Sequence, residues 1–165
     1  MPESTIVKTK RDGRLFFTDL AAAETFVVSF EAGDLSLTIP GPTVNNFLDR
    51  GVIGTTPAIR YGDDAPITGS FSAYLRDMSD ASYVTLMELI TQTGEVATTW
   101  VSTLGANAEC LVYDLSWVVE GTDHGDPSDH TCILKHCSVS GSLSEGDPDT
   151  ISINFTSWSL YPTLT

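Results

Sequence analysis

The chain has 165 residues, 41% of them hydrophobic, and its 22 acidic and 8 basic side chains give a formal net charge of −14 at pH 7. A chain of this length and apolar content can bury a core of its own, so we expect one domain covering residues 1–165. An acidic field repels phosphate, which argues against nucleic-acid binding by charge neutralisation. The sequence has no long apolar run and no signal-peptide pattern, so we expect neither a membrane span nor secretion.

The charges are unevenly distributed. Four of the 8 bases lie within the first 14 residues, namely Lys8, Lys10, Arg11 and Arg14. Between Arg76 and Lys135 there is no lysine or arginine, although ten aspartate or glutamate residues occur there. On composition alone, an ordinary soluble acidic protein explains this pattern.

The three cysteines, Cys110, Cys132 and Cys137, are odd in number and lack the spacing of a disulfide framework. Cysteines of this kind are typical of reduced, mostly buried thiols. We therefore expect no disulfide and a protein that is made in a cytosol and stays there.

The first forty residues predict strands joined by turns. A short strand over residues 15–19 follows the turn at Asp12-Gly13. Residues 25–30 and 34–39 each alternate apolar and polar side chains, with the turn sequence EAGD between them. Strict alternation predicts a half-buried strand, so we expect residues 25–39 to form a β-hairpin.

Residues 40–60 predict a long loop, because they contain three prolines and three glycines and show no sustained alternation. The segment is nevertheless rich in apolar side chains, namely Val44, Phe47, Leu48, Val52 and Ile53. A passive linker would be polar. Two interpretations stay open: a flap over the domain's own core, or an arm that docks on a partner.

Residues 61–94 predict a turn, a strand and a helix. YGDDAP (61–66) has the composition of a turn, and residues 67–75 alternate as a half-buried strand does. A helix is expected at about residues 80–93, with Ser79 or Asp80 as its N-cap and Gly94 at its end. Its apolar positions recur at helical spacing and are Tyr83, Leu86, Met87 and Ile90.

The second half predicts further strands at residues 96–102, 109–120, 130–146 and 149–162. Because Trp158 and Leu160 fall out of phase with Ile151, Ile153 and Phe155, we expect a bulge or bend near Thr156. The chain is therefore expected to be mainly β: a sandwich or barrel of about seven or eight antiparallel strands with one flanking helix.

No group of residues in the sequence predicts a catalytic or metal-binding site. The loop residues Asp123, His124, Asp126, Asp129 and His130 could converge on a cation, but an EF-hand would require glutamate where Leu134 stands. A zinc site from His130, Cys132, His136 and Cys137 fails because Cys137 points to the other side of a regular strand. There is no GxSxG motif and no phosphate-binding glycine loop. We expect no catalytic residue, no metal site and no cofactor.

Four segments resemble the major tail tube protein of long-tailed, siphovirus-type bacteriophages. They are KTKRDGRLFFTD (8–19), FEAGDLSL (30–37), FLDRG (47–51) and RYGDDAPITGSFSAYLRD (60–77), within the first 95 residues. The resemblance implies a β-sandwich with a flanking helix, forming hexameric rings stacked into a tube that conducts the phage genome during ejection. It also implies a virion protein assembled in the bacterial host cytoplasm, with tape measure, tail terminator and tip proteins as partners.

The sequence is compatible with that family. A channel that passes DNA without specific binding should avoid bases, and residues 77–134 have none. We expect the channel to be lined by Asp, Glu, Ser and Thr. We also hypothesise that the long loop is the inter-ring assembly arm, mobile in the free subunit and ordered in the tube. The residues assigned to this arm are Val44, Phe47, Leu48, Asp49, Arg50, Val52 and Ile53.

Two alternatives remain open. One is another β-sandwich component of a virion, such as a connector or terminator or the tube of a contractile tail. The other is a small β-sandwich module that stacks a ligand, for example a carbohydrate, on exposed Trp100, Trp117 or Trp158. The alternation of residues 111–119 places Trp117 in a core, which counts against the second alternative.

Overall fold

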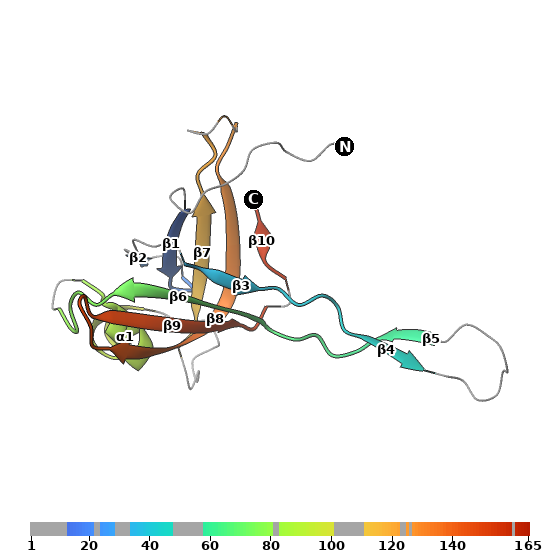
Figure 1. Ribbon diagram of the computed structural model, residues 1–165, viewed down its shortest axis with the longest axis horizontal. Coiled ribbons are helices and arrows are strands. Elements are labelled where there is room, and N and C mark those ends of the chain that lie inside the picture. Colours follow the sequence, from blue (N-terminus) through green and yellow to red (C-terminus); the bar gives the residue numbers. More distant parts are fainter. Residues whose placement is uncertain are drawn as a thin grey trace.

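A computed structural model describes residues 13–21, 24–28, 34–47, 58–80, 83–100, 111–122, 125, 127–159 and 161–165, with residues 46, 47, 58 and 59 described by backbone only. The described part is mainly β, as expected, with ten strands and two short helices. Seven strands form the path of the main sheet in the order β2-β1-β7-β8-β9-β6-β3, and an eighth, β10, pairs with β8 (Figure 1). These are β1 (Gly13–Thr18), β2 (Thr25–Val28), β3 (Ser36–Thr38), β6 (Ile67–Tyr74), β7 (Tyr113–Val119), β8 (His130–Ser144), β9 (Thr150–Ser157) and β10 (Thr163–Leu164).

The sheet folds over on itself. The ring centroids of Phe17 on β1 and Phe71 on β6 are 6.2 Å apart, although β7, β8 and β9 separate those strands within the sheet. Strand β8 belongs to both halves, because its first part pairs with β7 and its last part pairs with β9. Figure 1 shows β1 and β7 crossing over β6 and β9. The apolar faces of the two halves therefore enclose one core, as in the expected sandwich.

A bulge in β8 produces this change of direction. Tyr113 faces Cys137 and Leu115 faces Leu134, so β8 has one extra residue at this point. His136 there has φ 55°, a left-handed conformation that few side chains adopt. The bulge expected near Thr156 was wrong: β9 alternates regularly and ends at Ser157, so the exposed Trp158 lies outside the strand.

Two short helices replace the single expected one. Helix α1 (Leu86–Thr91) begins at Thr85, not at Ser79 or Asp80. The Thr85 hydroxyl accepts from the Glu88 amide, and the Glu88 carboxylate accepts from the Thr85 amide, so the two residues form a capping box. Helix α2 (Gly94–Thr99) lies where part of the 96–102 strand was expected, because Val96 and Trp100, four residues apart, are both buried.

The hairpin expected over residues 25–39 was also wrong. Strand β2 pairs with β1, whereas β3 pairs with β6. The two strands therefore lie at opposite ends of the strand order. Alternation identifies which side chains face the core, but it does not identify the neighbouring strand.

Helix α1 packs against the core face of β8. A Cβ atom on Gly141 would lie 2.5 Å from Ile90 Cδ1, so the Ile90 side chain of the helix packs directly over the backbone of β8 at this glycine. The core beneath the helix consists of large apolar side chains from both halves of the sheet, including Leu15, Phe17, Ile67, Phe71, Leu89, Tyr113, Leu115, Ile151 and Ile153.

Candidate assembly surfaces

The expected long loop contains a β-ribbon. Strands β4 (Val44–Phe47) and β5 (Ala58–Tyr61) form a separate two-stranded sheet that projects from the body (Figure 1). Pro40 and Pro42 precede β4, so they do not interrupt its pairing. The described part of this segment does not cover the core: the relative exposure of Val44 is 53% and that of Tyr61 is 83%.

The ribbon has two chemically different faces at its base. Val44 and Tyr61 are directly opposite one another, as are Asn45 and Arg60. Because side chains alternate along a strand, the first pair makes an apolar face and the second a polar face. The Gly62 amide donates to the Thr43 carbonyl at 2.8 Å, which extends the pairing toward the body.

Only part of the hypothesised arm can be placed. Val44 is exposed on β4, and Phe47 ends β4 with its side chain undescribed. Leu48, Asp49, Arg50, Val52 and Ile53 lie outside the described residues, between the two ribbon strands in sequence. The arm hypothesis therefore remains a prediction, and the structure adds Tyr61 to its candidate residues.

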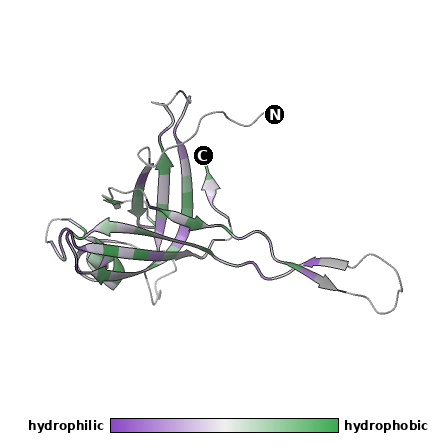
Figure 2. Ribbon diagram, in the orientation of Figure 1, coloured by the Kyte–Doolittle hydropathy of each residue, from purple (hydrophilic) through white to green (hydrophobic). Residues whose placement is uncertain are grey.

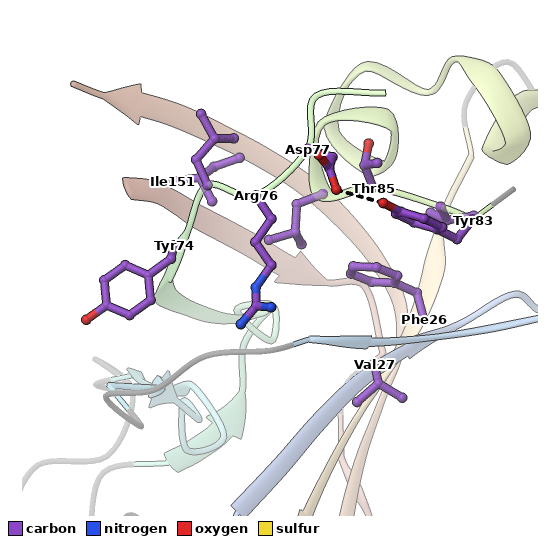
Figure 3. Close-up of a pocket in the computed structure, with 11 residues that line it drawn as sticks. Phe26, Val27, Tyr74, Arg76, Asp77, Tyr83, Thr85 and Ile151 are labelled. Carbon is purple, nitrogen blue, oxygen red and sulfur yellow. Dashed lines mark hydrogen bonds between the residues drawn. The ribbon is translucent and has the colours of Figure 1, made fainter. Parts of the chain in front are cut away.

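An apolar groove lies beside edge strand β2. Its volume is about 300 Å³, and β2, the end of β6 and the residues leading into α1 line it (Figure 3). The apolar lining comes from Phe26, Val27, Leu75, Val84, Leu86 and Ile151. Tyr83 also lines the groove and its relative exposure is 52%, so the groove is open to solvent.

Two charged residues lie at the groove. Asp77 accepts a hydrogen bond from the Tyr83 hydroxyl at 2.7 Å, and this bond raises the pKa of Tyr83 to about 12. Arg76 is exposed, and Figure 3 shows its guanidinium between Tyr74 and Phe26 in that view. Among the described residues, Arg76 forms no salt bridge, whereas Arg14 pairs with Glu120 and Lys135 with Asp114.

The outward face of strands β6, β9 and β8 is made of hydroxyl and amide side chains. Three successive cross-strand rows are Thr68–Thr156–Ser138, Ser70–Asn154–Ser140 and Ser72–Ser152–Ser142. The alternate residues on these strands face the core and α1, and Figure 2 shows the resulting bands of apolar and polar residues. We call these three rows the hydroxyl face. It carries no charged side chain, so it is a neutral hydrogen-bonding surface.

The carboxylates expected beside Ser and Thr on the channel wall are absent from the hydroxyl face. The three rows contain only Ser, Thr and Asn. Acidic residues such as Asp147 and Asp149 instead lie in the turn between β8 and β9. The acidic composition of the chain therefore does not describe this surface.

The described residues contain no group of three or more His, Cys, Asp or Glu side chains placed to hold a metal ion. Asp123, His124 and Asp126 lie outside the described part. Asp129 accepts from the Gly121 amide at 3.0 Å and from Thr122, and these bonds lower its pKa. Its carboxylate therefore anchors the start of the β7–β8 loop.

The three tryptophans do not form a common platform. Trp100 is buried, Trp117 packs partly against the core, and Trp158 is exposed and donates to the Ser138 hydroxyl at 3.1 Å. The expectation of an exposed stacking residue is therefore wrong for Trp100, whereas Trp158 is exposed. No helix in the described residues is long and apolar enough to span a membrane.

Comparison with known proteins gives matches in structure only. No protein-family model and no curated protein sequence matches the chain. Two cryo-EM structures of an extracellular contractile injection system, PVC, match with TM-scores of 0.57 over the whole chain. One is its sheath/tube terminator in the extended state, at 10% identity and 97% coverage of that chain. The other is its sheath-tube complex in the extended state, at 9% identity and 92% coverage.

The chain has the fold of a subunit of a tail-like injection system. At 9–10% identity the likeness is one of fold, and it covers 100% of this chain in both cases. The mainly β, antiparallel architecture implied by the sequence resemblance is confirmed by the eight-stranded sheet. Both of these structures come from a contractile injection system, and neither comes from a siphovirus-type tail.

Proposed function

We propose that the chain is a structural, non-catalytic subunit of a tail-like particle, acting as its tube or as the ring that terminates the tube. The observation that carries this proposal is the likeness of the entire chain to subunits of one such particle. The surfaces agree with a structural role. The described residues present a projecting ribbon, an open groove and a neutral face.

A contractile-type tube or terminator is better supported than the tube of a siphovirus-type tail. Both neighbours belong to a contractile system, and the sheath/tube terminator is matched over 97% of its length. The siphovirus resemblance rests on four short segments, three of which extend into residues outside the described part, namely 8–12, 30–33 and 48–51. Hexameric stoichiometry and genome passage remain proposals that follow from that resemblance.

The ribbon is the proposed arm between copies. A valine-sized side chain contributes about 1.5–3 kcal/mol when it is fully buried, and Val44 and Tyr61 are both exposed in the single chain. In a ring, every copy contributes one ribbon, so modest gains per copy add to a strong bond between rings. Leu48, Asp49, Arg50, Val52 and Ile53 connect the ribbon strands and extend this surface in our proposal.

The hydroxyl face is the proposed channel wall. Its Ser, Thr and Asn side chains exchange hydrogen bonds with water and carry no charge to hold a phosphate. A charged or extended polymer could therefore slide past it. In this proposal the channel wall is neutral, in place of the strongly negative wall that the net charge of −14 suggests.

Negative-stain electron microscopy of the purified protein at increasing concentration tests the proposal. Hollow tubes would indicate the tube role, and single closed rings would indicate the terminator role. Particles that stay monomeric at every concentration, with and without a tail-like template, would contradict both.

The arm is tested with the double variant Phe47→Ser/Leu48→Ser. We expect a folded subunit, by circular dichroism, that no longer assembles. The matched control is Leu164→Ser, which removes an apolar side chain of 71% relative exposure from β10. Loss of the fold in the double variant would show that these residues cover the chain's own core, and normal assembly would show that the arm has no role.

A further inference from the structure

We infer that the groove beside β2 is the receptor for the β4–β5 ribbon of a second copy of this chain, with Arg76 pairing with the carboxylates at the base of that ribbon. The inference rests on the proposed function, because it names the partner surface of the proposed arm.

The groove and the ribbon lie at opposite ends of the molecule. Figure 1 shows the ribbon extending from one end, and α1 together with the arrowhead of β6 at the other. The groove is lined by β2, the residues after β6 and those before α1, so it belongs to the second end. A chain therefore cannot fill its own groove with its own ribbon. Two different patches at opposite ends make a head-to-tail contact, which repeats from copy to copy.

The apolar faces of the two surfaces correspond. Tyr61 and Val44 form the exposed apolar pair of the ribbon, and Tyr83, with a relative exposure of 52%, is an exposed aromatic residue that lines the groove. The partly buried Phe26 and the buried Ile151 also line the groove, and Figure 3 shows the side chains of Phe26 and Val27 on opposite sides of β2. An aromatic ring such as that of Tyr61 could enter this space with its hydroxyl toward solvent.

The strand beside the groove is an edge strand of the described sheet. Among the described strands β2 pairs only with β1, so no described strand occupies its other edge. Each ribbon strand likewise pairs only with the other along its described length. Edge strands of this kind add to one another by backbone hydrogen bonds, while side chains entering a pocket determine which strand is accepted.

The charges of the groove and of the ribbon base are opposite in sign. Arg76 lies in the groove without a salt bridge to any described residue. Asp63 and Asp64 follow Tyr61 after one glycine, Gly62, and both are exposed. When Tyr61 occupies the groove, these carboxylates come within reach of Arg76. Arginine and carboxylate form directional, charge-assisted hydrogen bonds, so the pair would fix the register of the docked ribbon.

Disulfide trapping tests the contact directly. In the double variant Tyr83→Cys/Tyr61→Cys, mild oxidation should link groove to ribbon and produce a ladder of covalent multimers that reductant dissolves. The single variants control for the native thiols, and Tyr61→Cys/Ser140→Cys places the second thiol at an exposed position on the hydroxyl face. A ladder from the first pair alone supports the inference. Equal ladders from both pairs, or none from either, would overturn it.

A charge exchange provides an independent measurement. Arg76→Glu should raise the critical concentration for assembly about tenfold, and Asp64→Arg should do the same. Arg76→Glu combined with Asp64→Arg should restore most of the loss, which a merely damaged surface would not allow. Normal assembly by both single variants would reject the groove as receptor while leaving the proposed function intact. Failure of the wild-type chain to assemble at all would instead reject the proposed function.

Discussion

The Tyr113 hydroxyl donates a hydrogen bond to the backbone carbonyl of Leu89 at 3.0 Å. This bond joins β7 to α1 across 24 residues of sequence. The Tyr113 ring also contacts Trp100 edge-on, with the ring centroids 5.4 Å apart. One side chain therefore holds the α1–α2 segment against the sheet.

Replacing Tyr113 by phenylalanine isolates the hydrogen bond. The ring contacts remain, but the Leu89 carbonyl loses its hydroxyl partner, so we expect a loss of about 1–3 kcal/mol in the free energy of unfolding. Urea denaturation followed by circular dichroism measures it. Tyr161→Phe is the control, because the residue is 65% exposed and should change stability by less than about 0.5 kcal/mol. Equal effects of the two variants would contradict the role of the bond.

The capping box of α1 gives a second prediction. Thr85→Ala removes the oxygen that accepts from the Glu88 amide at 3.3 Å, and it also removes the donor to the Met78 carbonyl. We expect a destabilisation of about 1–2 kcal/mol. Thr85→Ser retains the hydroxyl and should recover most of this loss in a thermal melt. If Thr85→Ser recovers no stability, the methyl group of Thr85 contributes more to stability than its capping hydroxyl does.

The strands with a core face could be predicted from the sequence. Residues 67–75 alternate because β6 has one buried face, and residues 109–120 similarly predict β7. The ribbon had no such signal, because a two-stranded ribbon away from the core buries neither face. Its Val44 and Tyr61 are both exposed. The arm could therefore be inferred from the composition of residues 40–60, but its β structure could not be inferred from the sequence.

Features that depend on distant partners could not be predicted. The bulge at His136 is held by Asp114, whose carboxylate accepts from the His136 amide at 3.1 Å and from Lys135 Nζ at 2.8 Å. That partner is 22 residues away, so local alternation does not reveal it. The α1 cap was different: Thr85-Leu-Met-Glu88 is a capping-box sequence, and it could have located the helix start.

Alkaline pH gives the third prediction. Burial raises the pKa of Cys137 from its ordinary 9 to about 12, and burial also raises the pKa of Tyr113. Above pH 9 the unfolded chain loses the Cys137 proton while the folded chain keeps it. The unfolded state then binds fewer protons, so stability falls as pH rises through this window.

The measurement is the free energy of unfolding between pH 8 and 10 for wild type and Cys137→Ala. The variant is expected to be less stable throughout, because it leaves a small cavity. Its stability should nevertheless fall less steeply from pH 9 to 10, since one titrating thiol is gone. Parallel curves would show that Cys137 does not contribute to the pH dependence.

The hydroxyl face gives the last prediction, which tests the proposed channel wall. Ser142 and Asn154 are exposed and lie in neighbouring rows on β8 and β9. The double variant Ser142→Lys/Asn154→Lys would bring two cations from every copy together inside a ring. Each phosphate that these lysines neutralise adds about 0.9 to the slope of log affinity against log salt. The assembled variant should therefore retain a short oligonucleotide at 50 mM salt and release it at 200 mM, whereas the wild type should not bind it.

The matched control is Thr163→Lys/Thr165→Lys, which adds the same charge at the exposed end of the chain. Only lysines that face a shared lumen can combine their charges on one nucleic-acid strand. Strong oligonucleotide retention by the control variant, or no retention by the hydroxyl-face variant, would therefore show that the hydroxyl face is not the channel wall.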